Sequence, residues 1–324
     1  MSICLTGIKP TGDPHLGNYF GMIKPIVSYG ENPDYQEVFV FIANYHALNS
    51  HVSAETLRDN TYSIALDLLA SGLDPEKITL FYQSDIPELT ELTWIFHNLV
   101  TVPYLERAHA YKDALAQGKE ANMGLFAYPV LMAADILMYD SDVVPVGKDQ
   151  KQHVEIAQKI CRKFQHHYGE AFTYPEPDIS TATPLVPGLD GRKMSKSYNN
   201  TIQLFESQES TRKKVMKIAT DSKEPYEPKD PDQCALMTYY RLFASREDVF
   251  AIESRYREGT IGYKEMKDLL ASTMNNSLEP LRQKRRDIAH NQEYVNMVLR
   301  RGAEKARFKA QEKLALVKDM VGLV

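Results

Sequence analysis

The sequence predicts an α/β fold in which a Rossmann-like, doubly wound parallel sheet is followed by a smaller all-helical C-terminal domain. Short apolar segments alternate with segments of helical spacing through the first half of the 324-residue chain, which is the pattern of βαβ units. After about residue 200 the strand signals stop and only helical spacing remains. A chain of this length can form one main domain and a smaller one.

The elements of the first half follow from this spacing. Apolar runs at residues 3–6, 38–42, 77–82 and 143–146 predict strands. Residues 54–70, 89–99 and 126–139 have helical spacing, and Asp149 is expected to cap a long helix over residues 149–168. Because ligands bind at the carboxyl ends of parallel strands, we expect the loop at residues 7–12 to contact a ligand.

The second half is expected to begin with a loop. Residues 173–191 are rich in Pro, Gly and Asp, which is typical of irregular structure. Helical spacing then recurs at residues 206–220, 233–243, 247–257, 263–290 and 292–320. These segments predict the smaller helical domain.

The composition is that of a soluble globular protein, with 43% hydrophobic and 25% charged residues. No apolar run approaches the ~20 residues that span a bilayer, and the first residues do not resemble a secretion signal. We therefore predict a cytoplasmic protein with no membrane partner. The cysteines (Cys4, Cys161 and Cys234) are scattered and His166-His167 lacks neighbouring ligands, so neither a disulfide framework nor a structural metal is expected.

Two motifs predict phosphate chemistry. The first is Lys193-Met194-Ser195-Lys196-Ser197, in which two lysines and small hydroxyl residues can bind a polyphosphate. The second is His15-Leu16-Gly17-Asn18, where Gly17 lets a nucleotide approach the backbone and His15 and Asn18 are neutral donors. Alone, the first could be a solvated basic loop and the second an ordinary helix cap. Together they indicate adenylation.

The pair of motifs resembles the signatures of class I aminoacyl-tRNA synthetases, with Asn18 where many members have a second His. Two further segments, residues 128–137 and 144–153, resemble the specificity helix and the following strand and helix of bacterial tryptophanyl-tRNA synthetases. Tyrosyl enzymes are the nearest alternative, but they are expected to have a Gln where Met132 stands. Met132 cannot form a useful hydrogen bond, which favours tryptophan.

The expected amino-acid site lies on the helix over residues 126–139. Tyr128, Met132, Asp135 and Tyr139 are spaced to share one face. An indole N–H can only donate, so a fixed carboxylate is its matching acceptor, although an Asp on a helix of mixed polarity is more often at the surface. By resemblance, Gln150 meets the substrate ammonium, and the remaining tryptophan-binding residues are Leu5, Gly7, His46, Val144 and Val146.

The resemblance also implies an ATP site. Lys193, Lys196 and Lys112 would bind the leaving pyrophosphate together with Mg²⁺, while His15 and Asn18 hold phosphate oxygens. The implied ATP contacts are Lys9, Pro10, Thr11, Gly17, Asn18, Gly147, Lys148, Asp149, Val186, Lys193, Met194, Ser195, Lys196 and Ser197. Three residues depart from the family pattern: Lys9 replaces a Gln, Leu5 a Phe and Lys148 a Glu.

The resemblance further implies a domain plan and partners. Residues 1–200 would form the catalytic domain with an inserted helical dimer region at about 89–139, residues 201–290 a helical tRNA anticodon-binding domain, and residues 291–324 a C-terminal helix that packs back on the catalytic domain. The partners would be L-tryptophan, ATP, tRNA(Trp) and a second copy in a homodimer. Basic groups such as residues 284–286 and 305–309 either contact RNA or form ordinary exposed helix faces, and the net charge of −5 confines any RNA contact to local patches.

Two other function classes are open at this point. One is a nucleotidyltransferase with a similar His-Gly motif that does not act on tRNA, against which the full lysine pentapeptide and the helical domain argue. The other is a non-catalytic paralogue that binds RNA or a regulatory ligand. The intact lysines and the Asp135 helix argue against it.

Overall fold

The computed structural model describes residues 2–116, 118, 122–179 and 185–323. Its centre is a five-stranded, wholly parallel sheet in the order β3-β2-β1-β4-β5. The strands are β1 (Ser2–Ile8), β2 (Tyr35–Ile42), β3 (Ile78–Tyr82), β4 (Val143–Pro145) and β5 (Glu176–Asp178). The chain moves outward from β1 to β3 and then returns to the other side of β1, so the order reverses between β1 and β4, where doubly wound sheets bind ligands.

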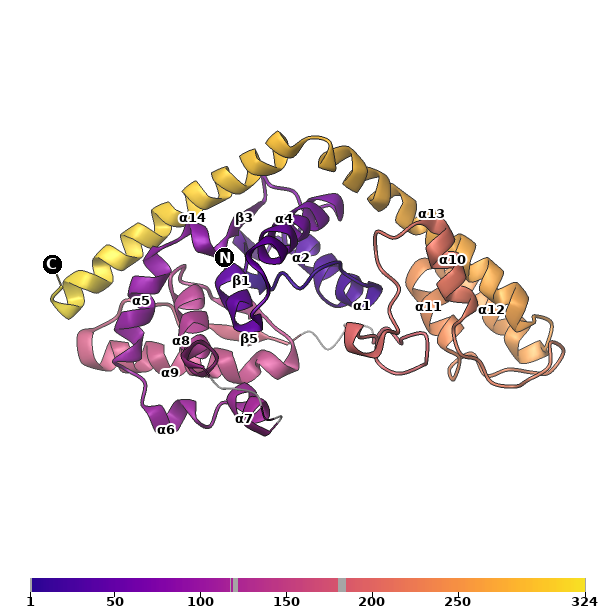
Figure 1. Cartoon of the computed structure of the whole chain (residues 1–324), viewed down its shortest axis with the longest axis horizontal. Helices are drawn as coiled ribbons and strands as arrows, with labels where there is room; N and C mark the ends of the chain where they lie inside the picture. Colours follow the sequence, from indigo (N-terminus) through magenta and orange to yellow (C-terminus); the bar gives the residue numbers. More distant parts are fainter. Residues whose placement is uncertain (1, 117, 119–121, 180–184, 324) are drawn as a thin grey trace.

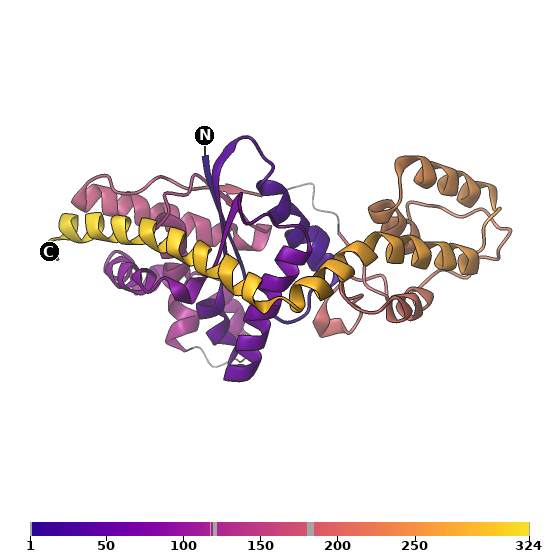
Figure 2. The same cartoon turned by 90° about the horizontal axis from the view of Figure 1, so that it is seen from above.

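Helices cover both faces of the sheet (Figures 1 and 2). On one face α5 (Glu88–His97), α8 (Met123–Leu137) and α9 (Lys151–Tyr168) form a continuous apolar core with the strands. On the other, α2 (Lys24–Tyr29) and α4 (Ala54–Ala70) do the same. The short helices are α1 (Leu16–Asn18), α3 (Asn44–Ala47), α6 (Val102–Leu105) and α7 (His109–Ala116). The predicted α/β class is confirmed.

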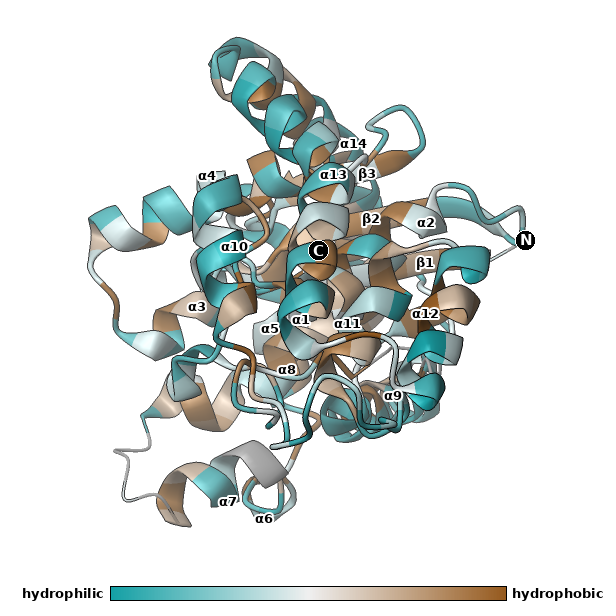
Figure 3. Ribbon diagram, turned by 90° about the vertical axis from the view of Figure 1, so that its right-hand side faces the viewer, coloured by the Kyte–Doolittle hydropathy of each residue, from teal (hydrophilic) through white to brown (hydrophobic). Residues whose placement is uncertain are grey.

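The second unit contains α10 (Gln208–Met216), α11 (Ala235–Phe243), α12 (Arg246–Glu258) and α13 (Tyr263–Ala289). Their apolar faces meet in a separate core that includes Tyr239, Tyr256 and Met266, all fully buried. Figure 3 shows the result: brown, hydrophobic ribbon concentrates in the sheet, whereas the outer helices α10 and α14 are mainly teal. Among the described helices, none combines the length and apolar character needed to cross a bilayer.

The last helix, α14 (Gln292–Val321), lies along the edge strand β3 (Figures 1 and 2). A Cβ on Gly302 would stand 1.9 Å from the carbonyl oxygen of Leu80, so only glycine allows this approach. Basic side chains of α14 pair with acids of the first unit: Lys305 and Lys309 with Glu37, Arg307 with Glu88, Lys313 with Asp140 and Lys318 with Glu91. These ion pairs hold α14 against the first unit. The helix thereby covers the edge strand β3, which would otherwise be open to pairing with another chain.

Two predicted details were wrong. Glu176–Asp178 forms the edge strand β5 inside the expected loop, because pairing with β4 overrides the turn propensity of Pro177, which is tolerated at an edge. Helix α9 begins at Lys151, and Asp149 lies in a preceding 3₁₀ turn instead of capping the helix. Tyr139 follows the end of α8 and stacks on Phe39 in the core, with ring centroids 5.0 Å apart. Burial, followed by the charge of Asp135, raises the pKa of its phenol.

Candidate active site

The two phosphate motifs are brought together by backbone pairing. Leu16 N donates to Ile202 O, and Leu204 N donates to Pro14 O, both at 2.9 Å. Residues 14–16 and 202–204 therefore run side by side. Residues 202–204 come only a few positions after the lysine pentapeptide. Residues 14–16 follow β1 in the chain, and near its carboxyl end β1 contacts β4, where Thr6 Oγ1 donates to Pro145 O at 3.3 Å. This is the point where the strand order reverses.

His15 has a defined tautomer and charge. Its Nδ1 accepts from Asn18 N at 3.2 Å, while His15 N donates to Asn18 Oδ1 at 3.1 Å, which closes a capping box on α1. Nδ1 is the acceptor, so the proton sits on Nε2. Burial, reinforced by the charges of Lys196 and Lys193, lowers the pKa of His15 to about 4. At neutral pH the ring is therefore an uncharged Nε2–H donor, which can bind a phosphate oxygen.

The lysine loop reaches the first loop of the sheet. Lys196 Nζ donates to Thr11 O at 2.8 Å, and burial lowers the pKa of Lys196. Lys193 is exposed, yet near enough to act electrostatically on His15. Met194, between the two lysines, is only 3% exposed and packs in the core of the second unit. Its side chain is thus an anchor, and its backbone is the part that can meet a nucleotide.

Asn200 holds this loop in shape, and sequence reasoning missed it. Its Oδ1 accepts from Ser195 N at 2.8 Å, and its Nδ2 donates to Asp190 Oδ1 at 2.7 Å and to Lys193 O at 3.2 Å. Gly188 makes room for it, because a Cβ there would lie 2.0 Å from Asn200 Nδ2. The available signal was a polar residue just after the pentapeptide with a glycine in the loop before it.

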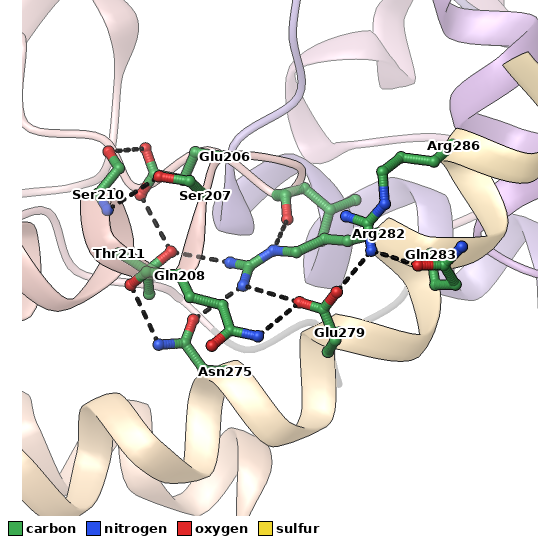
Figure 4. Close-up of polar contacts among 11 residues, drawn as sticks. Glu206, Ser207, Gln208, Ser210, Thr211, Asn275, Glu279, Arg282, Gln283 and Arg286 are labelled. Carbon is green, nitrogen blue, oxygen red and sulfur yellow. Dashed lines mark hydrogen bonds and ion pairs between the residues drawn. The ribbon is translucent and has the colours of Figure 1, made fainter.

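The segment that follows the lysine loop is joined to the helical unit by Arg282, whose contacts with Thr211 and Asn275 are drawn in Figure 4. The buried Arg282 of α13 donates to Thr211 Oγ1 and Asn275 Oδ1, each at 2.8 Å, and to Leu204 O at 3.4 Å. Tyr239 of α11 donates to Pro187 O. The lysine loop, through Met194, and the helical unit share one hydrophobic core. Arg282 is used internally rather than being free for RNA.

A buried carboxylate marks the second part of the site. Asp135 on α8 is 1% exposed, and His46 Nε2 lies 2.9 Å from its Oδ2. Gln83 Nε2 lies 2.9 Å from both carboxylate oxygens. Burial raises the pKa of Asp135, while the bonds from His46 and Gln83 oppose that rise. Gln83 was missed, although it follows β3 just as His46 follows β2, at the same edge of the sheet.

Predicted residues Tyr128 and Gln150 meet through His153, which was also missed. Tyr128 OH lies 2.6 Å from His153 Nε2, and His153 Nδ1 lies 2.8 Å from Gln150 Oε1. Burial, followed by the charge of Asp149, raises the pKa of Tyr128 to about 12, so the phenol keeps its proton. The Tyr128 ring stands edge-on to His46 at 6.0 Å, which joins this polar chain to the Asp135 cluster.

Apolar residues surround these polar groups. Leu5 and Val144 are buried in the sheet core, and Met132 and Val146 pack against the same core while partly exposed. Gly7 at the end of β1 allows the Phe41 ring to pass close by, because a Cβ would stand 2.4 Å from it. These apolar side chains and the Asp135 carboxylate therefore belong to one buried region on this face of the sheet.

Most of the remaining predicted residues are exposed and make few described contacts. Lys9 and Thr11 are exposed in the first loop, whereas Pro10 is buried. Gly147, Lys148 and Asp149 form an exposed turn after β4, and Val186 O accepts from Met194 N at 3.2 Å. Lys112 is exposed on α7, and no described contact joins it to the other site residues. No group of three or more metal-ligating side chains occurs within the described ranges.

Comparison with known proteins agrees with this arrangement. The family described as tRNA synthetases class I (W and Y) matches residues 1–279. The tryptophan–tRNA ligase of Fusobacterium nucleatum is 48% identical over 325 residues, which cover 100% of this chain and 99% of that protein. The corresponding ligase of Rhodopirellula baltica is 47% identical, covering 94% of each chain. A crystal structure of the Campylobacter jejuni tryptophanyl-tRNA synthetase complexed with ADP and tryptophan matches with a TM-score of 0.93, 42% identity and 99% coverage of both chains. The chain belongs to the class I tRNA synthetases for tryptophan and tyrosine, and within them to the tryptophan–tRNA ligases.

Proposed function

We propose that the enzyme activates L-tryptophan with ATP and then transfers it to the 3′ end of tRNA(Trp). The observation that carries this proposal is the buried Asp135 carboxylate, held by His46 and Gln83 against the apolar core of the sheet. A carboxylate has four acceptor positions, so one remains for an indole N–H. A phenylalanine ring has no such donor and would leave the buried charge without its partner, which costs affinity.

The apolar residues around Asp135 argue for tryptophan over tyrosine. Met132 stands where a phenolic hydroxyl would need a hydrogen-bonding side chain, and its thioether packs instead against the apolar core. Leu5, Val144 and Val146 complete walls suited to a flat aromatic ring. Tyr128 and Gln150 are the proposed contacts for the substrate ammonium.

The first step is adenylation. The tryptophan carboxylate attacks the α-phosphorus of ATP, and pyrophosphate leaves; the substrate is its own nucleophile, so the protein contributes positioning and charge stabilisation. His15 Nε2–H and the Asn18 amide are proposed to donate to phosphate oxygens. Lys196 and Lys193 bind the growing charge on pyrophosphate, and the family resemblance adds Lys112. ATP enters as its Mg²⁺ complex, whose ion is held by phosphate oxygens.

Other proposed ATP contacts come from the two flanking loops. Lys9, Pro10 and Thr11 lie beside Lys196, and Gly17 allows a phosphate close to the start of α1. The turn at Gly147, Lys148 and Asp149 lies at the neighbouring strand end, where it would meet ribose or adenine. Val186, Met194, Ser195 and Ser197 would contribute mainly backbone groups.

The second step needs tRNA and, by family resemblance, a dimer. We assign residues 1–200 to catalysis, 201–290 to anticodon binding and 291–324 to the helix that packs back on the sheet. The proposed dimer region at residues 89–139 contains large exposed apolar side chains, namely Trp94 (70% exposed), Val102 (58%) and Met123 (73%), which a second copy would cover. A cytoplasmic location accords with this role.

Exchange of labelled pyrophosphate into ATP tests the proposal. Purified enzyme is assayed with tryptophan, tyrosine, phenylalanine or no amino acid, and charging of tRNA(Trp) is measured in parallel. Exchange that depends on tryptophan alone supports the proposal. Exchange with tyrosine would indicate the tyrosyl alternative, exchange independent of any amino acid would indicate a nucleotidyltransferase, and no exchange at all would indicate a non-catalytic paralogue.

A further inference from the structure

A directed chain of hydrogen bonds connects Asp149 with Tyr128. Gln150 Nε2 donates to Asp149 Oδ2 at 2.7 Å. A carboxylate can only accept, so this bond fixes the orientation of the Gln150 amide and turns its Oε1 toward His153. His153 is 2% exposed, and its Nδ1 stands 2.8 Å from that Oε1.

The fixed orientation of the Gln150 amide determines the direction of the other hydrogen bonds in the chain. Gln150 Oε1 has no proton, so His153 Nδ1–H must be the donor to it. In the neutral imidazole Nε2 then carries the lone pair, and the Tyr128 hydroxyl, 2.6 Å away, must donate its proton to Nε2. Every proton in the chain thus points toward Asp149, and Tyr128 and Gln150 are left with unused oxygen lone pairs.

We infer that His153 is a positioning residue that makes Tyr128 Oη and Gln150 Oε1 acceptors for the α-ammonium group of the amino-acid substrate. An ammonium group has three donors and no acceptor, so it needs neighbours whose own protons point away from it. A Tyr128 hydroxyl that rotated freely could instead point its proton at the ammonium. This inference rests on the proposed tryptophan site and adds to it a residue that touches Tyr128 and Gln150 rather than the substrate.

The test compares the binding of two ligands, only one of which has an α-ammonium group. Tryptophan has this group, whereas indole-3-propionate has the same ring and carboxylate but no ammonium group. Dissociation constants are measured by calorimetry on the full-length enzyme. We expect His153→Phe to raise the Kd of tryptophan roughly 10- to 100-fold, the range for losing charge-assisted hydrogen bonds, and to change that of indole-3-propionate less than threefold. His166→Phe, an exposed histidine on the same helix, is the matched control and should change neither.

Two further variants separate positioning from packing. His153→Gln can place an amide oxygen near the position of Nε2, so we expect it to recover part of the tryptophan affinity. In a Tyr128→Phe background, His153→Phe should have a smaller effect than in the wild type, because His153 acts partly through the Tyr128 hydroxyl. Asp149→Ala, at an exposed position, removes the acceptor that fixes the Gln150 amide without disturbing the core. It should weaken the binding of tryptophan but not that of indole-3-propionate.

The outcomes are distinguishable. Equal weakening of both ligands, additive effects of His153→Phe and Tyr128→Phe, or unchanged tryptophan affinity in His153→Phe would each overturn the inference. If His153→Phe fails to fold, the same comparison of two ligands in Asp149→Ala decides. A wild-type enzyme that binds neither ligand would instead overturn the proposed function.

Discussion

Gln83 Nε2 and the Asp135 carboxylate form a fully buried contact in which the nitrogen lies 2.9 Å from both oxygens. The two residues come from different elements, the turn after β3 and the middle of α8. Burial favours the protonated acid, and Gln83 together with His46 opposes this by donating to the charged form. Gln83 therefore helps to keep Asp135 an acceptor for the substrate.

Replacing Gln83 with Leu should weaken tryptophan binding about tenfold, the usual effect of removing one partner from a buried charged group. The pKa of Asp135 is already raised, and without this donor it should rise further. Affinity, which needs the carboxylate, should then begin to fall at a higher pH than in the wild type as the solution is acidified. Calorimetric titration at several pH values measures this. Gln36→Leu, at an exposed position of β2, is the control, and identical pH profiles for Gln83→Leu and the wild type would contradict the role.

Lys196→Ala should lower kcat for adenylate formation by roughly a hundredfold and leave the Kd of tryptophan nearly unchanged. The Lys196 ammonium group contacts Thr11 of the first loop, and no described contact joins it to Asp135. Its loss should therefore remove stabilisation of the leaving pyrophosphate only. Pyrophosphate exchange and calorimetry give the two quantities. Lys213→Ala, whose lysine is exposed and pairs with Glu209, serves as the control. Normal exchange in Lys196→Ala would rule out the assigned role.

His15 should make the stability of the fold depend on pH, which an ordinary exposed histidine does not do. Its pKa is about 4 in the folded chain, against about 6.5 when unfolded. The neutral ring therefore contributes stability that is fully present above pH ~6.5 and is lost as the pH falls toward 4, because the unfolded chain takes up the proton first. Between pH 7 and 5 the free energy of unfolding should drop by on the order of 1 kcal/mol more in the wild type than in His15→Gln. Chemical denaturation at both pH values measures this, and equal drops would show that His15 is not held neutral.

Gly302→Ala tests how α14 meets the sheet. Alanine normally stabilises a helix interior by about 0.5–1 kcal/mol relative to glycine. Here the added Cβ would overlap the Leu80 carbonyl oxygen, so α14 must move away from β3 and the free energy of unfolding should fall by roughly 1–3 kcal/mol. Denaturant unfolding gives the sign directly. A more stable variant would mean that the close approach is absent.

The sequence predicted the fold class well because four of the strands are apolar runs and the helices of the second unit have clear spacing. It failed at β5, where Glu176, Pro177 and Asp178 have turn propensity and become a strand only by pairing with β4. The basic residues of α14 show a similar limit. Their charge is visible in the sequence, but the acids they pair with, such as Glu37 and Glu88, are distant along the chain.

The candidate site was predicted in part. Asp135, His46, Tyr128 and Gln150 were expected, and the structure brings them into one connected cluster. Residues that support this cluster or the lysine loop were missed, namely Gln83, His153 and Asn200. Each acts by filling the hydrogen-bonding needs of another side chain or of loop backbone, and such needs become visible only when the partners are in contact.

A crystal structure of the enzyme with ATP and the non-reactive amide of tryptophan tests the central claim most directly. The account predicts that the indole nitrogen lies about 3 Å from an oxygen of Asp135. It also predicts that the triphosphate lies between residues 15–18 and 193–197, within hydrogen-bonding distance of His15 Nε2 and Lys196 Nζ. An indole bound elsewhere, or a triphosphate in contact with only one of the two segments, would contradict it.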